Sequence, residues 1–207
     1  MDPAPRARGY RMKLVILDRD GTINADSVEY IKTTEEWMPL PGALEAIARL
    51  NHAGWHVVVA TNQSGLGRGL FDMAVLNAMH AKLHKMLAAV GGRIDAVFYC
   101  PHTPDDKCRC RKPEPGLFEQ IGERYGIDLK GVPVVGDALR DVVAGAAAGC
   151  EPHLVLTGHG SQYAGRELPD TFPPATQVHH DLGAFANWLI LRSAAPAAPS
   201  KPVLTKT

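Results

Sequence analysis

The chain has 207 residues, 45% of them hydrophobic and 21% charged, which is ordinary for a globular protein and excludes collagen, a coiled coil and wholesale disorder. Its 22 Lys and Arg residues balance its 22 Asp and Glu residues, so it lacks the basic surplus of a sequence-independent nucleic-acid binder. No apolar run approaches the ~18 residues of a membrane helix, and no signal-peptide core is present. We therefore expect a cytoplasmic protein with neither a nucleic-acid nor a membrane partner.

The length is that of one domain, which we place at residues 12–193 between two segments that we expect to be disordered, an arm at 1–11 and a tail at 194–207. Within the domain, apolar runs rich in Val, Ile and Leu alternate with amphipathic stretches, which is typical of a parallel sheet covered on both faces. Pro41 and Asp72 are suited to begin helices, and Gly54 to follow one. In chain order the pattern predicts strand 14–17, helix 41–54, strand 55–61, helix 72–90, strand 94–100, a polar loop to 115, helix 117–126, strand 132–137, helix 138–148, strand 153–157 and helix 181–193.

The fold class expected is α/β: a single Rossmann-like parallel sheet of about five strands, with helices on both faces and no large cap domain. Ligands of such sheets bind beyond the carboxyl ends of the strands. Polar residues stand at these ends: Asp18 and Asp20 after the first strand, Thr61 and Asn62 after the second, Asp137 after the fourth. This convergence predicts an active site.

The charges around that edge favour phosphate chemistry with a metal ion. Asp137 and Asp141 are one helical turn apart and can face the same side. Carboxylates that converge repel one another unless a hard divalent cation lies between them, and Mg²⁺ suits carboxylates that share it with phosphate oxygens. Lys112 adds a point charge for phosphate and Arg111 a fork of donors.

Three of the four cysteines lie close together in the polar loop. Cys100, Cys108 and Cys110, with His102 beside them, form a set of four soft or borderline ligands that is standard for a closed structural zinc site. Such a zinc-binding loop would fix where Arg111 and Lys112 stand. The alternative is that these are reduced thiols without metal. Cys150 lies apart, on a small-residue stretch, and is expected in the core.

Four segments resemble the motifs of the haloacid dehalogenase superfamily of phosphohydrolases: Asp18-Arg-Asp20-Gly-Thr, Thr61-Asn-Gln-Ser-Gly, Lys112-Pro and Gly136-Asp137-xxx-Asp141. With the zinc loop and Arg111, residues 12–192 are more narrowly similar to the D-glycero-D-manno-heptose 1,7-bisphosphate 7-phosphatases. The resemblance implies a Mg²⁺-dependent, monomeric enzyme of lipopolysaccharide-core heptose biosynthesis that converts this sugar bisphosphate to its 1-phosphate.

The resemblance also implies a role for each matching residue. Asp18 would be the nucleophile that forms an aspartyl-phosphate, and Asp20 the general acid and base. Asp18, the backbone carbonyl of Asp20, and Asp137 would bind Mg²⁺. Thr61 and Lys112 would stabilise the transferring phosphoryl group, with Asp141 orienting Lys112 or a metal-bound water. The substrate contacts expected are Asp26, Asn62, Gln63, Ser64 and Arg111.

Some features depart from the family or leave the reading open. Ala138 stands where many relatives carry Lys, and we expect the nearby Arg140 to point elsewhere. Arg68 and Arg109 are either further cations near the substrate or solvated side chains, and no histidine outside the loop shows metal spacing. Two alternatives remain: a histidinol-phosphate phosphatase, which shares the zinc loop and all four motifs, and a zinc-stabilised, non-catalytic module that binds nucleic acid.

Overall fold

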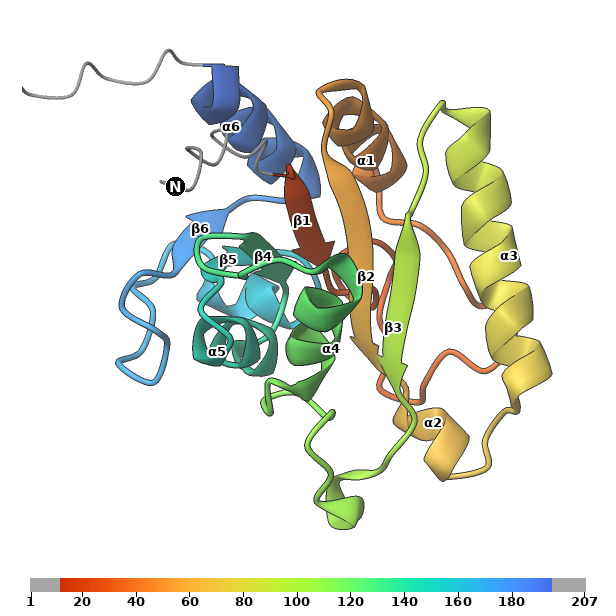
Figure 1. Cartoon of the computed structure of the whole chain (residues 1–207). Helices are drawn as coiled ribbons and strands as arrows, with labels where there is room; N and C mark the ends of the chain where they lie inside the picture. The colour runs from red at the N-terminus through yellow and green to blue at the C-terminus, as the bar shows by residue number, and fades with distance from the viewer. Residues whose placement is uncertain (1–11, 195–207) are drawn as a thin grey trace, which may run out of the picture.

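The computed structural model describes residues 12–194, so the arm predicted at 1–11 and nearly all of the tail predicted at 194–207 lie outside the described residues. Six parallel strands form one sheet in the order β3-β2-β1-β4-β5-β6 (Figure 1). The strands are β1 (Leu14–Leu17), β2 (His56–Asn62), β3 (Ala96–Cys100), β4 (Pro133–Gly136), β5 (Glu151–Val155) and β6 (Gln177–His179). The expected parallel α/β fold is therefore confirmed.

Helices cover both faces of this sheet. They are α1 (Ala43–His52), α2 (Ser64–Gly67), α3 (Met73–Ala89), α4 (Gly116–Tyr125), α5 (Leu139–Ala147) and α6 (Leu182–Ala194), with 3₁₀ helices η1 (Pro104–Asp106) and η2 (Gly158–Tyr163). Side chains alternate between the faces along each strand. In β1, Val15 and Leu17 pack with α1, α3 and α6, whereas Leu14 and Ile16 pack with α4. The continuous apolar run of β1 thus serves two cores at once.

The sequence-based boundaries differ from the structure at a few places. The sheet has six strands rather than about five, since the short edge strand β6 was not predicted, and neither was α2. Strand β5 begins at Glu151 and ends at Val155, two residues earlier at each end than expected, and α6 extends to Ala194. The predicted cap of α3 is present: the Asp72 side chain accepts a hydrogen bond from the Val75 backbone amide at 2.9 Å.

The segment between β1 and α1 folds back over the carboxyl edge of the sheet instead of forming a separate domain. Isolated bridges join Asn24 to Asp20 and to Pro39, and Trp37 of the same segment is fully buried in the apolar core. The connections that follow β1 and β2 therefore border the carboxyl edge of the sheet directly.

Across residues 12–194, no helix is both long enough and apolar enough to cross a membrane.

Candidate active site

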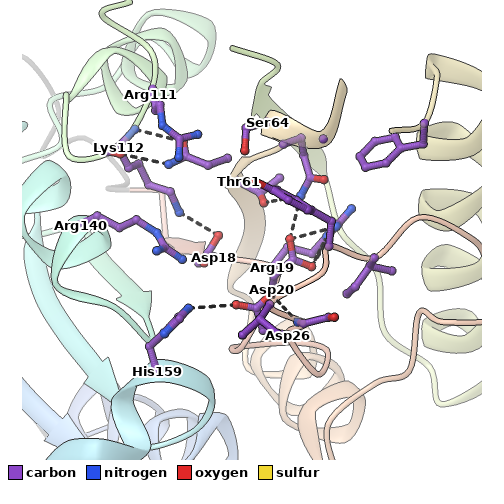
Figure 2. Close-up of a pocket in the computed structure, with 18 residues that line it drawn as sticks. Asp18, Arg19, Asp20, Asp26, Thr61, Ser64, Arg111, Lys112, Arg140 and His159 are labelled. Atoms are coloured by element: carbon purple, nitrogen blue, oxygen red, sulfur yellow. Dashed lines mark hydrogen bonds and ion pairs between the residues drawn. The ribbon is translucent and has the colours of Figure 1, made fainter. Parts of the chain in front are cut away.

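A cavity of about 320 Å³ opens at the carboxyl ends of β1 and β2 (Figure 2). It contains every side chain that the sequence assigns to phosphoryl transfer or substrate contact. These are Asp18, Asp20, Asp26, Thr61, Asn62, Gln63, Ser64, Arg111 and Lys112. The convergence predicted from the strand ends is thus present in space.

Asp18 and Lys112 form a buried ion pair at the floor of the cavity. The Lys112 Nζ atom lies 2.8 Å from Asp18 Oδ1 and 2.6 Å from Asp141 Oδ1, and it donates to the Ala60 carbonyl at 2.8 Å. Burial opposes the charge of Lys112, but Asp141 and Asp18 raise its pKa above the ordinary value, so it remains a cation. Burial, with the charge of Asp141, raises the pKa of Asp18 to about 6, although Lys112 partly offsets the rise.

A third carboxylate, Asp137, completes an acidic cluster behind Asp18. One oxygen of each of Asp18, Asp137 and Asp141 lies within 4.8 Å of the others. Burial and the charges of Asp141 and Asp18 raise the pKa of Asp137 to about 8. Among the residues described, its Oδ1 atom is buried without a hydrogen-bond partner, while Oδ2 accepts from the His159 backbone amide at 2.7 Å. A hard cation would satisfy this oxygen and relieve the repulsion, so the donor set fits a divalent metal ion.

Glycines leave room for the Asp137 carboxylate. A Cβ atom on Gly21 would lie 2.1 Å from Asp137 Oδ2, and one on Gly158 would lie 2.2 Å from the same atom. Both glycines also have positive φ, of 78° and 49°. Any larger residue at either position would displace the carboxylate, so the turns after β1 and β5 fix where a metal could bind.

Asp20 is held by a clamp that the sequence reading did not foresee. The buried Arg19 guanidinium donates to both carboxylate oxygens at 2.8 and 2.9 Å. Asn24 Nδ2 and Gln63 Nε2 add bonds of 2.9 and 2.8 Å. Burial opposes the ionisation of Asp20, but these donors, with Arg19 the strongest, hold its pKa below the ordinary value.

Two of the predicted substrate contacts are engaged by the protein itself. Both ends of the Asn62 side-chain amide bind the backbone of Lys112, at 3.0 and 3.1 Å. Gln63 Nε2 bridges Asp20 and the Thr61 hydroxyl, at 2.8 and 2.9 Å. Asn62, the last residue of β2, therefore holds the backbone of Lys112 against the end of that strand. Gln63 links the segment after β1, which carries Asp20, to the end of β2, which carries Thr61.

The rim of the cavity carries charged groups that the sequence did not place there. Arg140 lines it near Lys112 and Asp18, so the expectation that Arg140 points elsewhere on its helix is wrong (Figure 2). Its guanidinium makes no hydrogen bond or ion pair to any residue in 12–194. His159 Nε2 lies 3.2 Å from Asp26 Oδ2, joining the segments after β1 and β5.

Arg19, Arg140 and His159 were missed because tertiary packing, not local pattern, brings them to the site. For Arg19 one signal was available: a cation between two acidic residues at a strand end has little choice of partner. The other two cations considered do not line the cavity. Arg68 stacks over the Tyr30 ring at 6.0 Å, and the exposed Arg109 pairs with Glu119 at 3.2 Å.

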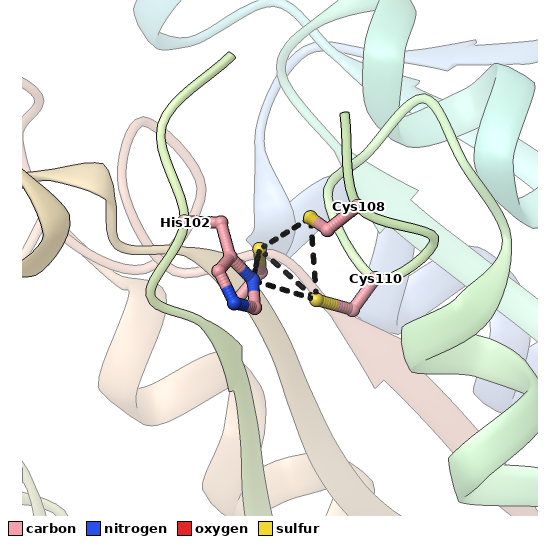
Figure 3. Close-up of side chains that lie close together, drawn as sticks. His102, Cys108 and Cys110 are labelled. Atoms are coloured by element: carbon pink, nitrogen blue, oxygen red, sulfur yellow. Dashed lines mark hydrogen bonds between the residues drawn. The ribbon is translucent and has the colours of Figure 1, made fainter. Parts of the chain in front are cut away.

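The three loop cysteines and His102 face a common centre (Figure 3). The distances between the sulfur atoms are 3.2, 3.5 and 3.6 Å, far longer than a disulfide bond. Ligands about 2.3 Å from a tetrahedral ion lie about 3.8 Å apart, close to this spacing. His102 Nδ1 lies 3.3 Å from Cys110 Sγ and 3.5 Å from Cys100 Sγ. The donor set therefore fits a closed metal site.

Cys150 lies apart from this cluster, in the apolar core next to α4. Burial raises the pKa of its thiol to about 12, so it remains protonated. The prediction of a core residue is confirmed.

Comparisons with known proteins agree with this geometry. A family model described as HAD-hydrolase-like matches residues 109–185. D-glycero-beta-D-manno-heptose-1,7-bisphosphate 7-phosphatases from Bordetella bronchiseptica and Pseudomonas aeruginosa are 56% and 54% identical to the chain, each over 86% of it and over 98% and 97% of their own lengths.

A solved structure gives the same result. The chain superposes on the D,D-heptose 1,7-bisphosphate phosphatase from B. bronchiseptica, complexed with magnesium and phosphate, with a TM-score of 0.83. The two sequences are 55% identical, and the match covers 87% of this chain and 99% of that one. With the motif residues gathered around one cavity, the chain belongs to the heptose 1,7-bisphosphate 7-phosphatase family of haloacid dehalogenase-like hydrolases.

Proposed function

We propose that the protein hydrolyses the 7-phosphate of D-glycero-β-D-manno-heptose 1,7-bisphosphate and releases the 1-phosphate. The observation that carries the proposal is the buried Asp18 carboxylate, paired with Lys112 at the floor of a cavity whose rim holds Arg111 and Arg140. A nucleophilic carboxylate at the floor suits one phosphoryl group, and the two guanidinium groups suit the other. The names of the B. bronchiseptica and P. aeruginosa relatives specify the same substrate.

The reaction has two steps. In the first, an Asp18 oxygen bonds to phosphorus while the bond from phosphorus to the sugar oxygen breaks. That oxygen receives a proton from Asp20, which must enter this step protonated although the donors around it favour its ionised form in the free enzyme. In the second, Asp20 takes a proton from water, whose oxygen attacks the aspartyl-phosphate, so that inorganic phosphate leaves and Asp18 is regenerated. Lys112 and the Thr61 hydroxyl hold the phosphoryl oxygens throughout.

Magnesium is the metal that we assign to the acidic cluster. The Asp18 carboxylate, the Asp20 backbone carbonyl and Asp137 would hold it, and the unpartnered Asp137 Oδ1 atom is the observation that supports this assignment. When bound, the ion supplies positive charge that offsets the repulsion between the nucleophile and the phosphate. Asp141 faces Lys112 and the Ala138 backbone, so we assign it the orientation of Lys112.

Zinc is the metal that we assign to the loop cluster of Cys100, His102, Cys108 and Cys110. Four protein ligands leave no open position, so its role would be structural. Arg111 Nη1 donates to the His102 carbonyl at 3.3 Å, and Lys112 follows directly in the chain. A metal that closes the loop would therefore hold both cations in place.

Histidinol phosphate fits this cavity less well. Histidinol carries an ammonium group in place of a second phosphate, and the rim would present it with Arg111 and Arg140. A non-catalytic nucleic-acid module is not favoured either, because the chain belongs to a phosphatase family and keeps all four motifs.

The test is a panel of phosphate esters assayed for released phosphate, with Mg²⁺ and with a chelator. It includes the α and β heptose bisphosphates, heptose 7-phosphate and histidinol phosphate, with Asp18→Asn as the control that removes the nucleophile. We expect the β bisphosphate to have the highest kcat/KM, and Asp18→Asn to lose at least ~10³-fold in kcat. A higher kcat/KM for histidinol phosphate would overturn the substrate assignment, and an active Asp18→Asn would overturn the mechanism.

A further inference from the structure

The guanidinium of Arg19 has both of its edges occupied. The side chain of Arg19 is 1% exposed, and the residue is the second after β1, next to Asp18. One edge, Nε and Nη2, faces the Asp20 carboxylate, with the Nε contact at 3.0 Å. On the other edge, Nη1 lies 3.4 Å from Nε2 of His80, a residue of α3. Arg19 therefore connects a helix on one face of the sheet to a carboxylate at the carboxyl edge.

The chemistry of the two groups sets the direction of that contact. Burial, and then the charge of Arg19, lowers the pKa of His80 to about 4, so its imidazole is neutral at neutral pH. The guanidinium is always charged and only donates. Nε2 of His80 must then be the acceptor, with the ring proton on Nδ1. His80 thus supports the Arg19 guanidinium by accepting a hydrogen bond from it, and we call this contact the seat of Arg19.

Asp20 is left with a single orientation. Besides the Arg19 fork, Asn24 donates to its Oδ1 atom and Gln63 to its Oδ2 atom. Its side chain is still 18% exposed, on the side that lines the cavity. A carboxylate held by donors on both oxygens cannot rotate freely, so its direction toward the cavity is set by these donors, of which Arg19 alone contacts both oxygens.

We propose that Arg19, seated on His80, is a positioning residue that aims Asp20 at the leaving-group oxygen and thereby sets the activity toward esters with poor leaving groups. The inference rests on the proposed role of Asp20 as general acid. A sugar alkoxide leaves poorly unless it is protonated as its bond to phosphorus breaks, whereas a nitrophenolate leaves without help. Misplacing Asp20 should therefore affect alkyl phosphates far more than activated aryl phosphates.

The first variant is Arg19→Lys, which keeps a positive charge beside Asp20 but loses the planar fork. Its kcat/KM is measured for the heptose bisphosphate and for aryl phosphates that range from phenyl to dinitrophenyl phosphate. We expect a loss of ~10²-fold or more for the bisphosphate, the scale of general acid catalysis. The loss for dinitrophenyl phosphate should be at least about tenfold smaller, so that the rate depends more steeply on the leaving group.

The second variant, His80→Leu, removes the seat and leaves Arg19 itself intact. Its matched control is His84→Leu, one turn further along α3, where the side chain is exposed. His80→Leu should also lose more kcat/KM for the bisphosphate than for dinitrophenyl phosphate, but by a smaller factor than Arg19→Lys. His84→Leu should lose kcat/KM for neither ester. Thermal unfolding and Mg²⁺ titration of each variant test whether the fold and the acidic cluster remain intact.

Asp20→Asn separates a failure of this inference from a failure of the mechanism. If Asp20→Asn is selective for poor leaving groups but Arg19→Lys and His80→Leu slow all esters equally or not at all, Arg19 and His80 only stabilise the fold and the inference is overturned. If Asp20→Asn slows every ester equally, Asp20 is not the general acid, and the mechanism falls together with the inference.

Discussion

Lys112 and Arg111 are adjacent in the chain but contact different parts of the site. Lys112 is buried against Asp18 and Asp141, whereas Arg111 reaches the rim and the His102 carbonyl. The two residues lie in a bend and turn closed by the Glu114 amide, which donates to the Arg111 carbonyl at 2.9 Å, and their side chains leave it in different directions. We propose that Lys112 serves the chemical step and Arg111 the recognition of substrate. The two roles can be separated by mutation.

We expect Lys112→Ala to lower kcat for every phosphate ester, because it removes the cation that faces the transferring group and leaves Asp18 and Asp141 unpaired. Arg111→Ala should lower kcat/KM by at least about tenfold for the bisphosphate alone. The second phosphate of that substrate is the group that Arg111 would bind, and an aryl phosphate lacks it. The measurement is both variants against the bisphosphate and an aryl phosphate at fixed Mg²⁺. An equal loss on both substrates in Arg111→Ala would place Arg111 in the chemical step instead.

The raised pKa values of Asp18 and Asp137, about 6 and about 8, predict that Mg²⁺ binding displaces protons. The apparent Kd for Mg²⁺ should therefore decrease as the pH rises from 6 to 8, by up to about tenfold per unit for each proton released. Without Mg²⁺ the folded state holds these protons more tightly than the unfolded state, so its stability should fall as the pH rises from about 4 to about 8. Calorimetric titration in buffers of different ionisation enthalpy measures the protons released. A Kd independent of pH would contradict the prediction.

At the scale of elements, the loop from β3 to α4 contains no long helix or strand, so its shape depends on cross-links. The capping box of η1, in which the Asp106 carboxylate accepts from the Thr103 backbone and hydroxyl at 2.7 and 2.8 Å, orders only one turn. Asn62 holds the Lys112 backbone at 3.0 and 3.1 Å, and Arg111 bonds to the His102 carbonyl. The cluster of three cysteines and His102 would join the two ends of the loop once it holds a metal ion.

We expect purified protein to contain about one zinc ion per chain that survives mild dialysis. Cys108→Ser should lower both the thermal stability and kcat/KM, because structural zinc contributes directly to folding. Cys150→Ser is the matched control, since it changes a cysteine outside the cluster and should retain the zinc. A metal-free preparation with full activity and unchanged heat resistance would contradict the zinc assignment.

A second element-scale feature is a histidine pair between β5, β6 and α6. His153 is fully buried, with ring centroids 4.9 and 4.8 Å from Phe185 and Trp188, and its Nδ1 atom lies 3.0 Å from His179 Nε2. Burial, which is the main cause, and the neighbouring His179, which is the next, lower the pKa of His153 to about 3. The neutral imidazole is therefore part of the apolar core.

This lowered pKa predicts acid sensitivity. The unfolded state, in which histidine has a pKa of about 6.5, binds the proton more readily than the folded state. The contribution of the neutral His153 to the free energy of unfolding is therefore fully present above pH 6.5 and is lost as the pH falls toward 3. Between pH 6.5 and 5 the wild type should lose about 2 kcal/mol more than His153→Leu, at about 1.4 kcal/mol per pKa unit. Urea unfolding at both pH values measures the difference, with the exposed His52→Gln as control. Parallel losses in wild type and His153→Leu would refute it.

At the scale of the whole molecule, the sequence predicts those parts of the fold that a local run of apolar residues marks. The apolar runs at residues 14–17 and 55–61 predict buried strands, which the structure has at 14–17 and 56–62, and the polar residues at their ends predict the site. Strand β6 has three residues with a largely exposed centre, so no apolar run marks it. The directions of Arg140 and His159 depend on how α5 and η2 sit on the sheet, and no local periodicity contains that information.

The domain boundaries give a prediction at this scale. Residues 12–194 contain every residue of the cavity, the loop cluster and the apolar cores described above. We expect a protein cut to these residues to keep kcat/KM and the unfolding temperature within about twofold and a few degrees of the full chain, and to elute as a monomer. Gel filtration with light scattering and the phosphate assay measure this. A dimer would contradict the expectation of a monomer, and a loss of activity on truncation would place further function in the segments removed.

The position of β1 in the sheet has a consequence during protein synthesis. Strand β1 is made first but lies between β2, which follows closely, and β4, which begins only at Pro133. As the chain leaves the ribosome, β1, β2 and β3 can associate early, with Asp18 and Thr61 already at the carboxyl ends of β1 and β2, while Asp137 is still to be translated. If magnesium binds as proposed, its set of ligands is complete only after β4 has been made, so we expect the ion to stabilise the finished fold rather than the early stages of assembly.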